Sequence, residues 1–114
     1  DNSKYSNNVL KINDDYIFYI DGSPKYIDGY LYINFLSYSS DNIYLKVRIY
    51  NNNHEIISET GLIKKNEFLE KVRINEALVT NNLSYKVMSY VKDTYTSAGE
   101  VILNVRVDDS NYEK

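Results

Sequence analysis

Apolar and polar side chains alternate without interruption from Ile43 to Tyr50. A period of two puts successive side chains on opposite faces of a β-strand, so one face of this segment is buried and the other meets water. Three asparagines at 51–53 follow directly, and asparagine is a preferred turn residue. The pattern predicts a central strand of an antiparallel sheet that ends in a turn.

Shorter segments of the same kind recur along the chain, and turn-forming residues separate them about every eight to twelve positions. We expect strands over 9–12, 15–20, 30–36, 43–50, 54–58, 68–74, 83–91 and 100–107, and one helical turn over 75–78. No segment shows the 3.6-residue period of a longer helix. Seven to eight antiparallel strands in a single domain predict an all-β fold, an immunoglobulin-like β-sandwich.

The parity of the apolar residues on these strands predicts which side chains form the core. In the segment 68–74, the same face is expected to carry Phe68, Val72 and Ile74. We expect one buried cluster that contains Leu45, Val47, Ile49, Val72, Ile74, Val87, Leu103 and Val105.

Length and composition describe one domain, 1–114, without covalent cross-links. A chain of 114 residues can bury a hydrophobic core, and the polar ends at 1–8 and 108–114 are predicted to be flexible. Cysteine is absent, which excludes disulfides and thiolate metal sites. The net charge is −3 with acids and bases interspersed, so no nucleic-acid partner is predicted. No apolar run reaches the roughly 18 residues of a membrane span, so this segment is not expected to insert into a membrane.

Four residue types dominate the composition: the chain holds 15 asparagines, 13 tyrosines, 12 isoleucines and 10 lysines. All four have A/T-rich codons, which indicates a low-GC genome such as that of a clostridium. Selection for a binding surface rich in tyrosine and asparagine is the alternative explanation.

Two local patterns resemble known families. The spacing of Leu78, Tyr85 and Val87 resembles the tyrosine corner of immunoglobulin and fibronectin type III domains. That resemblance implies a hydrogen bond from the Tyr85 hydroxyl to a backbone group between Leu78 and Asn82. Val87 would then take the core position that a cysteine occupies in antibody domains.

The segment 58–68 resembles small exported or membrane-tethered proteins of Gram-positive bacteria that often accompany conjugative or integrative elements. Lys65 and Asn66 stand where those proteins carry Pro-Gly, and asparagine tolerates the left-handed backbone that glycine supplies. The resemblance covers roughly 31–107 and implies an extracellular or cell-surface immunoglobulin-like module; it brings no catalytic residue. Because the chain begins at Asp1, we interpret it as a mature fragment whose export signal or anchor lies outside this segment.

Candidate catalytic and metal-binding residues are few. His54 is the single histidine, and it follows the asparagine turn, where we expect a solvated side chain. Zinc would need further imidazole or thiolate ligands. The acidic pairs at 14–15 and 108–109 lack the spacing of a calcium loop. We therefore predict a protein that is not an enzyme and that uses no cofactor and no metal.

Tyrosine supplies the one candidate binding surface. Tyr30, Tyr32, Tyr44 and Tyr50 all have the parity opposite to the core residues of their strands. If those strands pair, the four rings form one exposed face suited to a protein or glycan partner. The alternative is that codon bias and the strand propensity of tyrosine explain these positions.

The function predicted from these observations is a non-enzymatic, extracellular or surface-tethered binding or structural module. The alternative is an assembly subunit, pilin-like or toxin-accessory, that self-associates through its edge strands. Concentration-dependent oligomerisation separates the two, and the sequence leaves the oligomeric state open.

Overall fold

The computed structural model describes residues 9–11 and 17–107, and the chain is all-β with antiparallel pairing throughout this part. Two four-stranded sheets have the orders β1-β2-β5-β8 and β11-β10-β6-β7, and a three-stranded sheet has the order β3-β4-β9. The strands are β1 (Val9–Lys11), β2 (Ile17–Tyr19), β3 (Lys25–Ile27), β4 (Tyr30–Tyr32), β5 (Phe35–Ser37), β6 (Ile43–Tyr50), β7 (Ile56–Glu59), β8 (Phe68–Leu69), β9 (Val72–Arg73), β10 (Asn82–Val91) and β11 (Ser97–Arg106).

One 3-10 turn, η2 (Glu76–Leu78), is the helical element of the described residues, and it confirms the helical turn expected at 75–78. The Asn75 side chain caps it by accepting a hydrogen bond from the Ala77 amide at 2.9 Å. No helix in the described ranges is long and apolar enough to cross a membrane. The expected flexible ends, 1–8 and 108–114, lie outside the described residues.

The long strands β6, β10 and β11 form the centre of the β11-β10-β6-β7 sheet. Val47 lies opposite Val87 on β10, and Val87 lies opposite Val101 on β11. Along β6 the buried and half-buried side chains alternate at every position, which confirms the strand and the buried face predicted from the sequence. The alternation arises because one face of this sheet packs on the core and the other is open to water.

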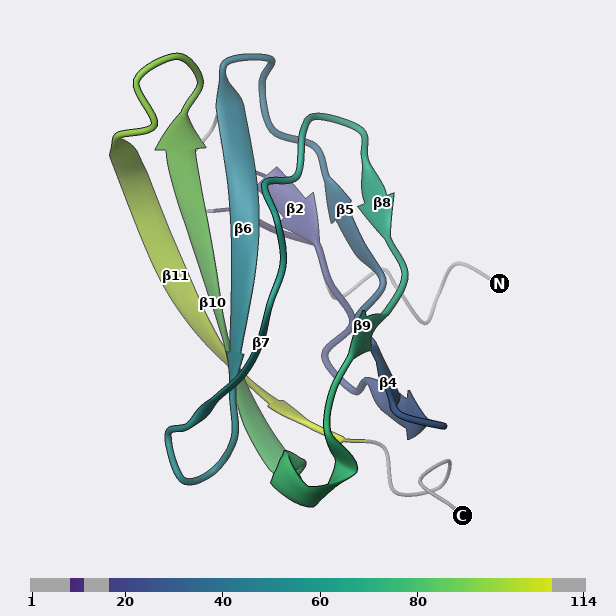
Figure 1. The fold of residues 1–114 in the computed structure, drawn as a ribbon. Helices are drawn as coiled ribbons and strands as arrows, with labels where there is room; N and C mark the ends of the chain where they lie inside the picture. Colours follow the sequence, from purple (N-terminus) through teal and green to yellow (C-terminus); the bar gives the residue numbers. More distant parts are fainter. Residues whose placement is uncertain (1–8, 12–16, 108–114) are drawn as a thin grey trace.

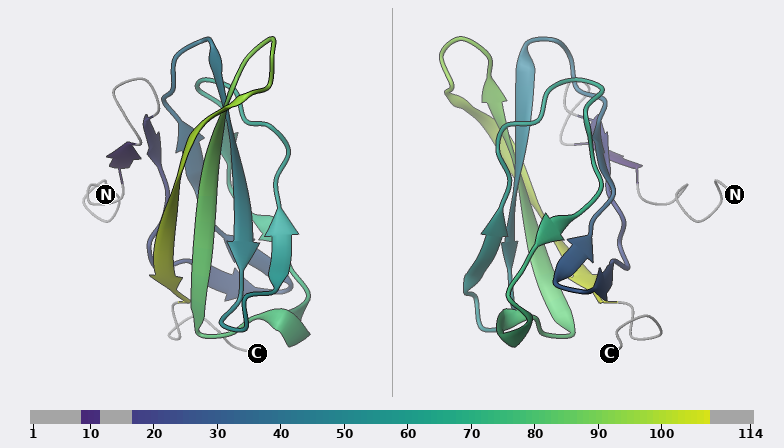
Figure 2. Two further views of the ribbon diagram at one scale, coloured as in Figure 1. Left: turned by 90° about the vertical axis from the view of Figure 1, so that its left-hand side faces the viewer. Right: turned by 45° about the vertical axis from the view of Figure 1, so that its right-hand side comes forward.

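The other two sheets lie across the core from the β11-β10-β6-β7 sheet (Figures 1 and 2). Buried side chains from all three sheets form one hydrophobic cluster. Within the β1-β2-β5-β8 sheet, the rings of Phe18 and Phe35 stack with centroids 5.4 Å apart. Of the predicted core residues, six are buried in one cluster: Leu45, Val47, Ile49, Ile74, Val87 and Val105. Val72 and Leu103 are partly buried and pack against the cluster.

The strands are more numerous than the seven to eight expected, because two predicted strands are each broken in two and β3 (Lys25–Ile27) lies in a segment where no strand was predicted. Between β4 and β5, Asn34 adopts a left-handed backbone with φ 47° and donates its amide to the Glu70 carbonyl at 2.9 Å. The segment that pairs with β4 and β5 is interrupted opposite Asn34, between β8 and β9. The expectation that Phe68 shares the buried face of Ile74 is wrong: Phe68 is 56% exposed and Ile74 is buried.

Tyr85 does not make the hydrogen bond that the tyrosine-corner resemblance implies. Its side chain is completely buried, and its hydroxyl has no hydrogen-bond partner within the described part of the chain. Burial raises the pKa of Tyr85 well above its ordinary value, and the negative charge of Asp21 adds to the increase. The Tyr85 ring therefore packs in the core, while burial of its hydroxyl without a hydrogen-bond partner among the described residues lowers the stability of the fold.

We expect Tyr85→Phe to raise the free energy of unfolding by about 1–2 kcal/mol, because it removes a buried polar group without a partner. Because the folded pKa of Tyr85 is raised, ionisation of the phenol favours the unfolded state over the folded state, and folding becomes less favourable in alkali. This pH-dependent part of the stability is complete below about pH 10, the pKa of an unfolded tyrosine, and is lost as pH rises through the folded pKa. The variant should lack this part of the alkaline loss. Urea unfolding from pH 7 to pH 11 measures both effects, and a Tyr85→Phe variant less stable at pH 7 contradicts the prediction.

Candidate functional site

The four predicted tyrosines do not form a single face. Tyr30 and Tyr32 lie on β4, whose partners are β3 and β9, whereas Tyr44 and Tyr50 lie on β6 in the β11-β10-β6-β7 sheet. All four are half-buried. The expectation of one continuous face is wrong because β4 and β6 belong to different sheets and do not pair.

Tyr30 and Tyr32 contact two cations, one on β9 and one just before it, and β9 pairs with β4. The Lys71 ammonium lies 4.5 Å from the Tyr30 ring centroid and 5.4 Å from that of Tyr32. The Arg73 guanidinium lies 5.4 Å from the Tyr30 centroid and also donates a 3.2 Å hydrogen bond to the Tyr30 hydroxyl. These contacts are cation–π interactions, which use the ring faces that a ligand would otherwise contact.

Tyr44 gathers with two tyrosines that the sequence analysis did not single out. Tyr90 on β10 lies directly opposite Tyr44, and the Tyr95 ring lies 6.2 Å from the Tyr44 ring. Tyr95 belongs to the hairpin loop between β10 and β11, at the top of Figure 1, and is 58% exposed. We refer to Tyr44, Tyr90 and Tyr95 as the tyrosine end.

The hairpin loop holds Tyr95 in an unusual backbone conformation. Tyr95 has φ 57°, and its amide donates a 2.7 Å hydrogen bond to the Val91 carbonyl. The Val91 amide in turn donates to the Thr96 carbonyl at 2.9 Å. A tyrosine in the left-handed region is uncommon, and such positions concentrate at functional sites. The alternation along β10 could have predicted that Tyr90 lies on the outer face of the sheet. Alternation gives no prediction for a loop residue such as Tyr95.

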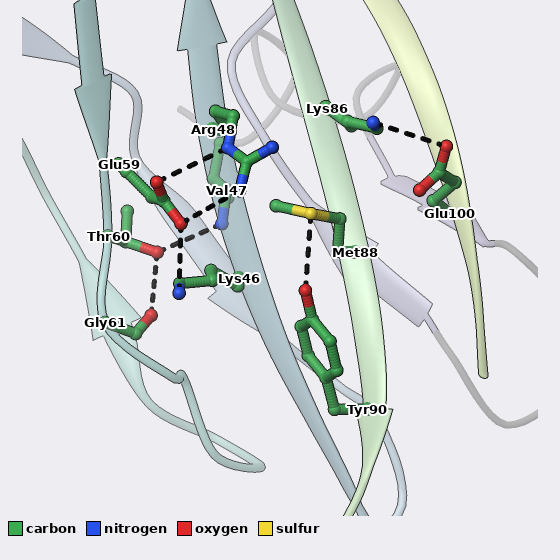
Figure 3. Close-up of polar contacts among 10 residues, drawn as sticks. All are labelled: Lys46, Val47, Arg48, Glu59, Thr60, Gly61, Lys86, Met88, Tyr90 and Glu100. Carbon is green, nitrogen blue, oxygen red and sulfur yellow. Dashed lines mark hydrogen bonds and ion pairs between the residues drawn. The ribbon is translucent and has the colours of Figure 1, made fainter. Parts of the chain in front are cut away.

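A group of charged side chains adjoins the tyrosine end on the outer face of the same sheet (Figure 3). Glu59 forms ion pairs with Lys46 at 3.0 Å and with Arg48 at 3.3 Å. Lys46 and then Arg48 lower the pKa of Glu59 through hydrogen bonds. The pKa of Arg48 is raised, first by its hydrogen bond with Tyr50 and then by Glu59. Tyr50 thus belongs to the charged group and lies at the opposite end of β6 from Tyr44.

We expect Glu59→Gln to lower the free energy of unfolding by about 0.5–1 kcal/mol at pH 7, since these pairs are partly exposed. Because the folded pKa of Glu59 is lowered, the carboxylate stabilises the fold above its unfolded pKa, and this effect disappears as pH falls through the folded pKa. Urea midpoints measured from pH 7 downward should therefore converge for the wild type and the variant. A difference that persists into strong acid contradicts the prediction.

A pocket of about 360 Å³ opens between the end of β7 and β8, lined by Thr60, Gly61, Leu62, Ile63, Glu67, Phe68 and Leu69. Leu62 and Phe68 are 41% and 56% exposed. The polar side chains of the lining accept hydrogen bonds from backbone amides: Thr60 from Val47 at 3.0 Å, and Glu67 from Lys64 at 2.7 Å. The pocket therefore has a mixed lining of polar and apolar groups.

The residues considered for catalysis and metal binding are dispersed. His54 is exposed in the turn after β6, as expected, with φ 66°. Within the described ranges, no three His, Cys, Asp or Glu side chains form a group that could hold a metal ion. The acidic pairs at 14–15 and 108–109 lie outside the described residues.

No protein-family model, no curated protein and no solved structure matches this chain.

Proposed function

We propose that this chain is an immunoglobulin-like β-sandwich domain that binds a protein or glycan partner through the tyrosine end, without catalysis. The observation that carries the proposal is the meeting of Tyr44, Tyr90 and Tyr95 from β6, β10 and their hairpin loop. Tyrosine offers a rigid apolar ring with a hydrogen-bonding tip, and it is enriched at recognition surfaces.

The position of the tyrosine end favours recognition over a structural role. Tyr95 is more than half exposed, and its strained loop presents the ring to solvent. Lys46 continues the surface along β6, so that aromatic and charged groups lie side by side on one face. Such a mixture of rings and ion pairs resembles the anchors and polar rim of an interface.

The remaining parts of the proposal rest on the fold and the sequence. Antiparallel sheets on both sides of one core support the immunoglobulin-like β-sandwich. The A/T-rich codon bias and the resemblance of the segment 58–68 support an extracellular or surface-tethered protein of a low-GC Gram-positive bacterium.

The test applies the labelled domain to a glycan array and to an array of bacterial surface proteins. Tyr44→Ser and Tyr95→Ser should each weaken a specific signal about tenfold or more, because aromatic anchors dominate binding energy. Tyr50→Ser is the matched control, since Tyr50 lies on the same strand and face as Tyr44 but at the other end. Equal losses from all three variants, or no signal that depends on Tyr44 and Tyr95, would count against the proposal.

A further inference from the structure

The β11-β10-β6-β7 sheet has an open edge at β11. Strand β11 spans ten residues and has β10 on one side, with no other described strand on the opposite side. Figure 1 shows β11 at the outer margin of the molecule. An unpaired edge of this length is a template for pairing with another strand.

The hydrogen-bond register shows which backbone groups face the open edge. The Val107 amide donates to the Asn81 carbonyl at 2.9 Å, and the register continues with Val105 opposite Leu83 and Leu103 opposite Tyr85. In an antiparallel ladder, alternate residues direct their amide and carbonyl toward the same neighbour. The odd-numbered residues therefore bond to β10. The amides and carbonyls that point away from it belong to Glu100, Ile102, Asn104 and Arg106.

This edge lacks the features that protect the other edge strands. Strand β7 has four residues and a register shift between Ile49 and Tyr50 of β6, and β8 has two residues. In β11 the irregularity is confined to the start, where Gly99 has φ 125°. From Glu100 to Arg106 the strand is regular and contains no proline and no lysine. Edge strands that must stay unpaired usually carry such residues or bulges.

The side chains along β11 are self-complementary. If two copies pair antiparallel about Leu103, Glu100 of each lies opposite Arg106 of the other on the outer face. Glu100 pairs with Lys86 at 3.6 Å within the chain, and Arg106 makes no ion pair with another described residue. A cation would then lie on both sides of each Glu100 carboxylate. Among the antiparallel registers that pair the open-edge groups, the one centred on Leu103 alone sets Glu100 opposite Arg106.

The same register covers apolar surface. Ile102, which is 60% exposed, would lie diagonal to Ile102 of the second copy, within reach for side-chain contact. On the inner face, Leu103 would lie opposite Leu103 of the second copy, and Val101 opposite Val105. Val101 and Leu103 are only partly buried in the single chain, so pairing would complete their burial.

The geometry points to a homodimer in which β11 of two copies pairs antiparallel about Leu103 and joins two four-stranded sheets into one. The occupant of the edge is thus a second copy of this chain. The inference goes beyond the proposed binding function, since it uses the edge of the sheet and leaves the tyrosine end free.

Sedimentation of the wild type from about 1 µM to 1 mM should show a concentration-dependent dimer. Asn104→Pro removes an amide that faces only the open edge. The fold should therefore persist, while the dissociation constant of the dimer should rise by about tenfold or more. Asn104→Ala is the matched control and should dimerise like the wild type. Arg106→Glu should also weaken the dimer, and adding Glu100→Arg should restore it.

A cross-link tests the register directly. The chain has no cysteine, so Leu103→Cys introduces a single thiol. Opposed residues of a non-hydrogen-bonded pair have Cα atoms about 4.5 Å apart, within the range that a disulfide spans. Leu103→Cys should form a disulfide dimer on mild oxidation, and Lys92→Cys, in the hairpin loop, should not.

Three results overturn the inference. They are a chain that stays monomeric at 1 mM, a dimer that survives both Asn104→Pro and Arg106→Glu, and equal cross-linking of the two cysteine variants. Circular dichroism of each variant checks its fold. If Asn104→Pro fails to fold, Arg106→Glu and the cross-link decide the outcome.

Discussion

Phe35→Ala should lower the free energy of unfolding by about 3–5 kcal/mol, the range for truncating a buried phenylalanine. The Phe35 side chain is completely buried and stacks on Phe18 at 5.4 Å between centroids. Its removal takes away the transfer energy of the ring and leaves a cavity in the middle of the core. Since domains of this size are stable by about 5–15 kcal/mol, the loss is a large share of the total.

The matched control is Phe68→Ala, because it removes the same ring from a site that is 56% exposed. The two phenylalanines lie on neighbouring strands, where Phe68 is opposite Leu36 and Phe35 is opposite Leu69. We expect Phe68→Ala to change stability by less than about 1 kcal/mol. Equal changes in the urea midpoint of the two variants would falsify this description of the core.

Asn51→Ala should lower the free energy of unfolding by about 2–3 kcal/mol, because the side chain satisfies four backbone and side-chain groups at once. Its carbonyl oxygen accepts from the Asn53 and Glu55 amides at 2.9 and 3.0 Å. Its amide group donates to the Glu55 carboxylate at 2.7 Å and to the Leu78 carbonyl at 3.0 Å. Asn51 is 3% exposed, so the groups it leaves behind would lose partners in a protected place.

Asn53→Ala is the control for this turn, since Asn53 is exposed and contributes its backbone amide to the network. We expect it to change the midpoint of thermal unfolding little. Asn51→Asp separates the accepted hydrogen bonds of the side chain from the donated ones. It keeps the two accepted hydrogen bonds but places a second carboxylate next to that of Glu55. Its destabilisation should therefore shrink as pH falls and the carboxylates are protonated. A turn that tolerates Asn51→Ala as well as Asn53→Ala contradicts the assigned role.

Alternation along the chain was enough to predict the central strands and their inward faces. Val47 and Val87 are buried as expected, because a strand with one apolar face can be buried in only one way. The helical turn at 75–78 was also predictable, and its Asn75 cap is a local side-chain interaction. These features depend on residues close together in sequence.

The tertiary structure decided what depends on pairing between distant segments. Local parity placed Tyr30 and Tyr44 on the outer faces of their strands, but strand order put them in different sheets and placed Tyr90 beside Tyr44. The left-handed backbone at Asn34 broke one predicted strand, and Phe68 on the neighbouring strand is exposed.

The Tyr85 hydroxyl and the open edge of β11 show the same division. Sequence determined that Tyr85 is inward and that β11 is a strand, because side-chain alternation is a property of the local backbone. It did not determine whether a partner reaches the hydroxyl or whether another strand covers the edge. Those outcomes depend on contacts between residues far apart in the chain, and only the assembled sheets bring such residues together.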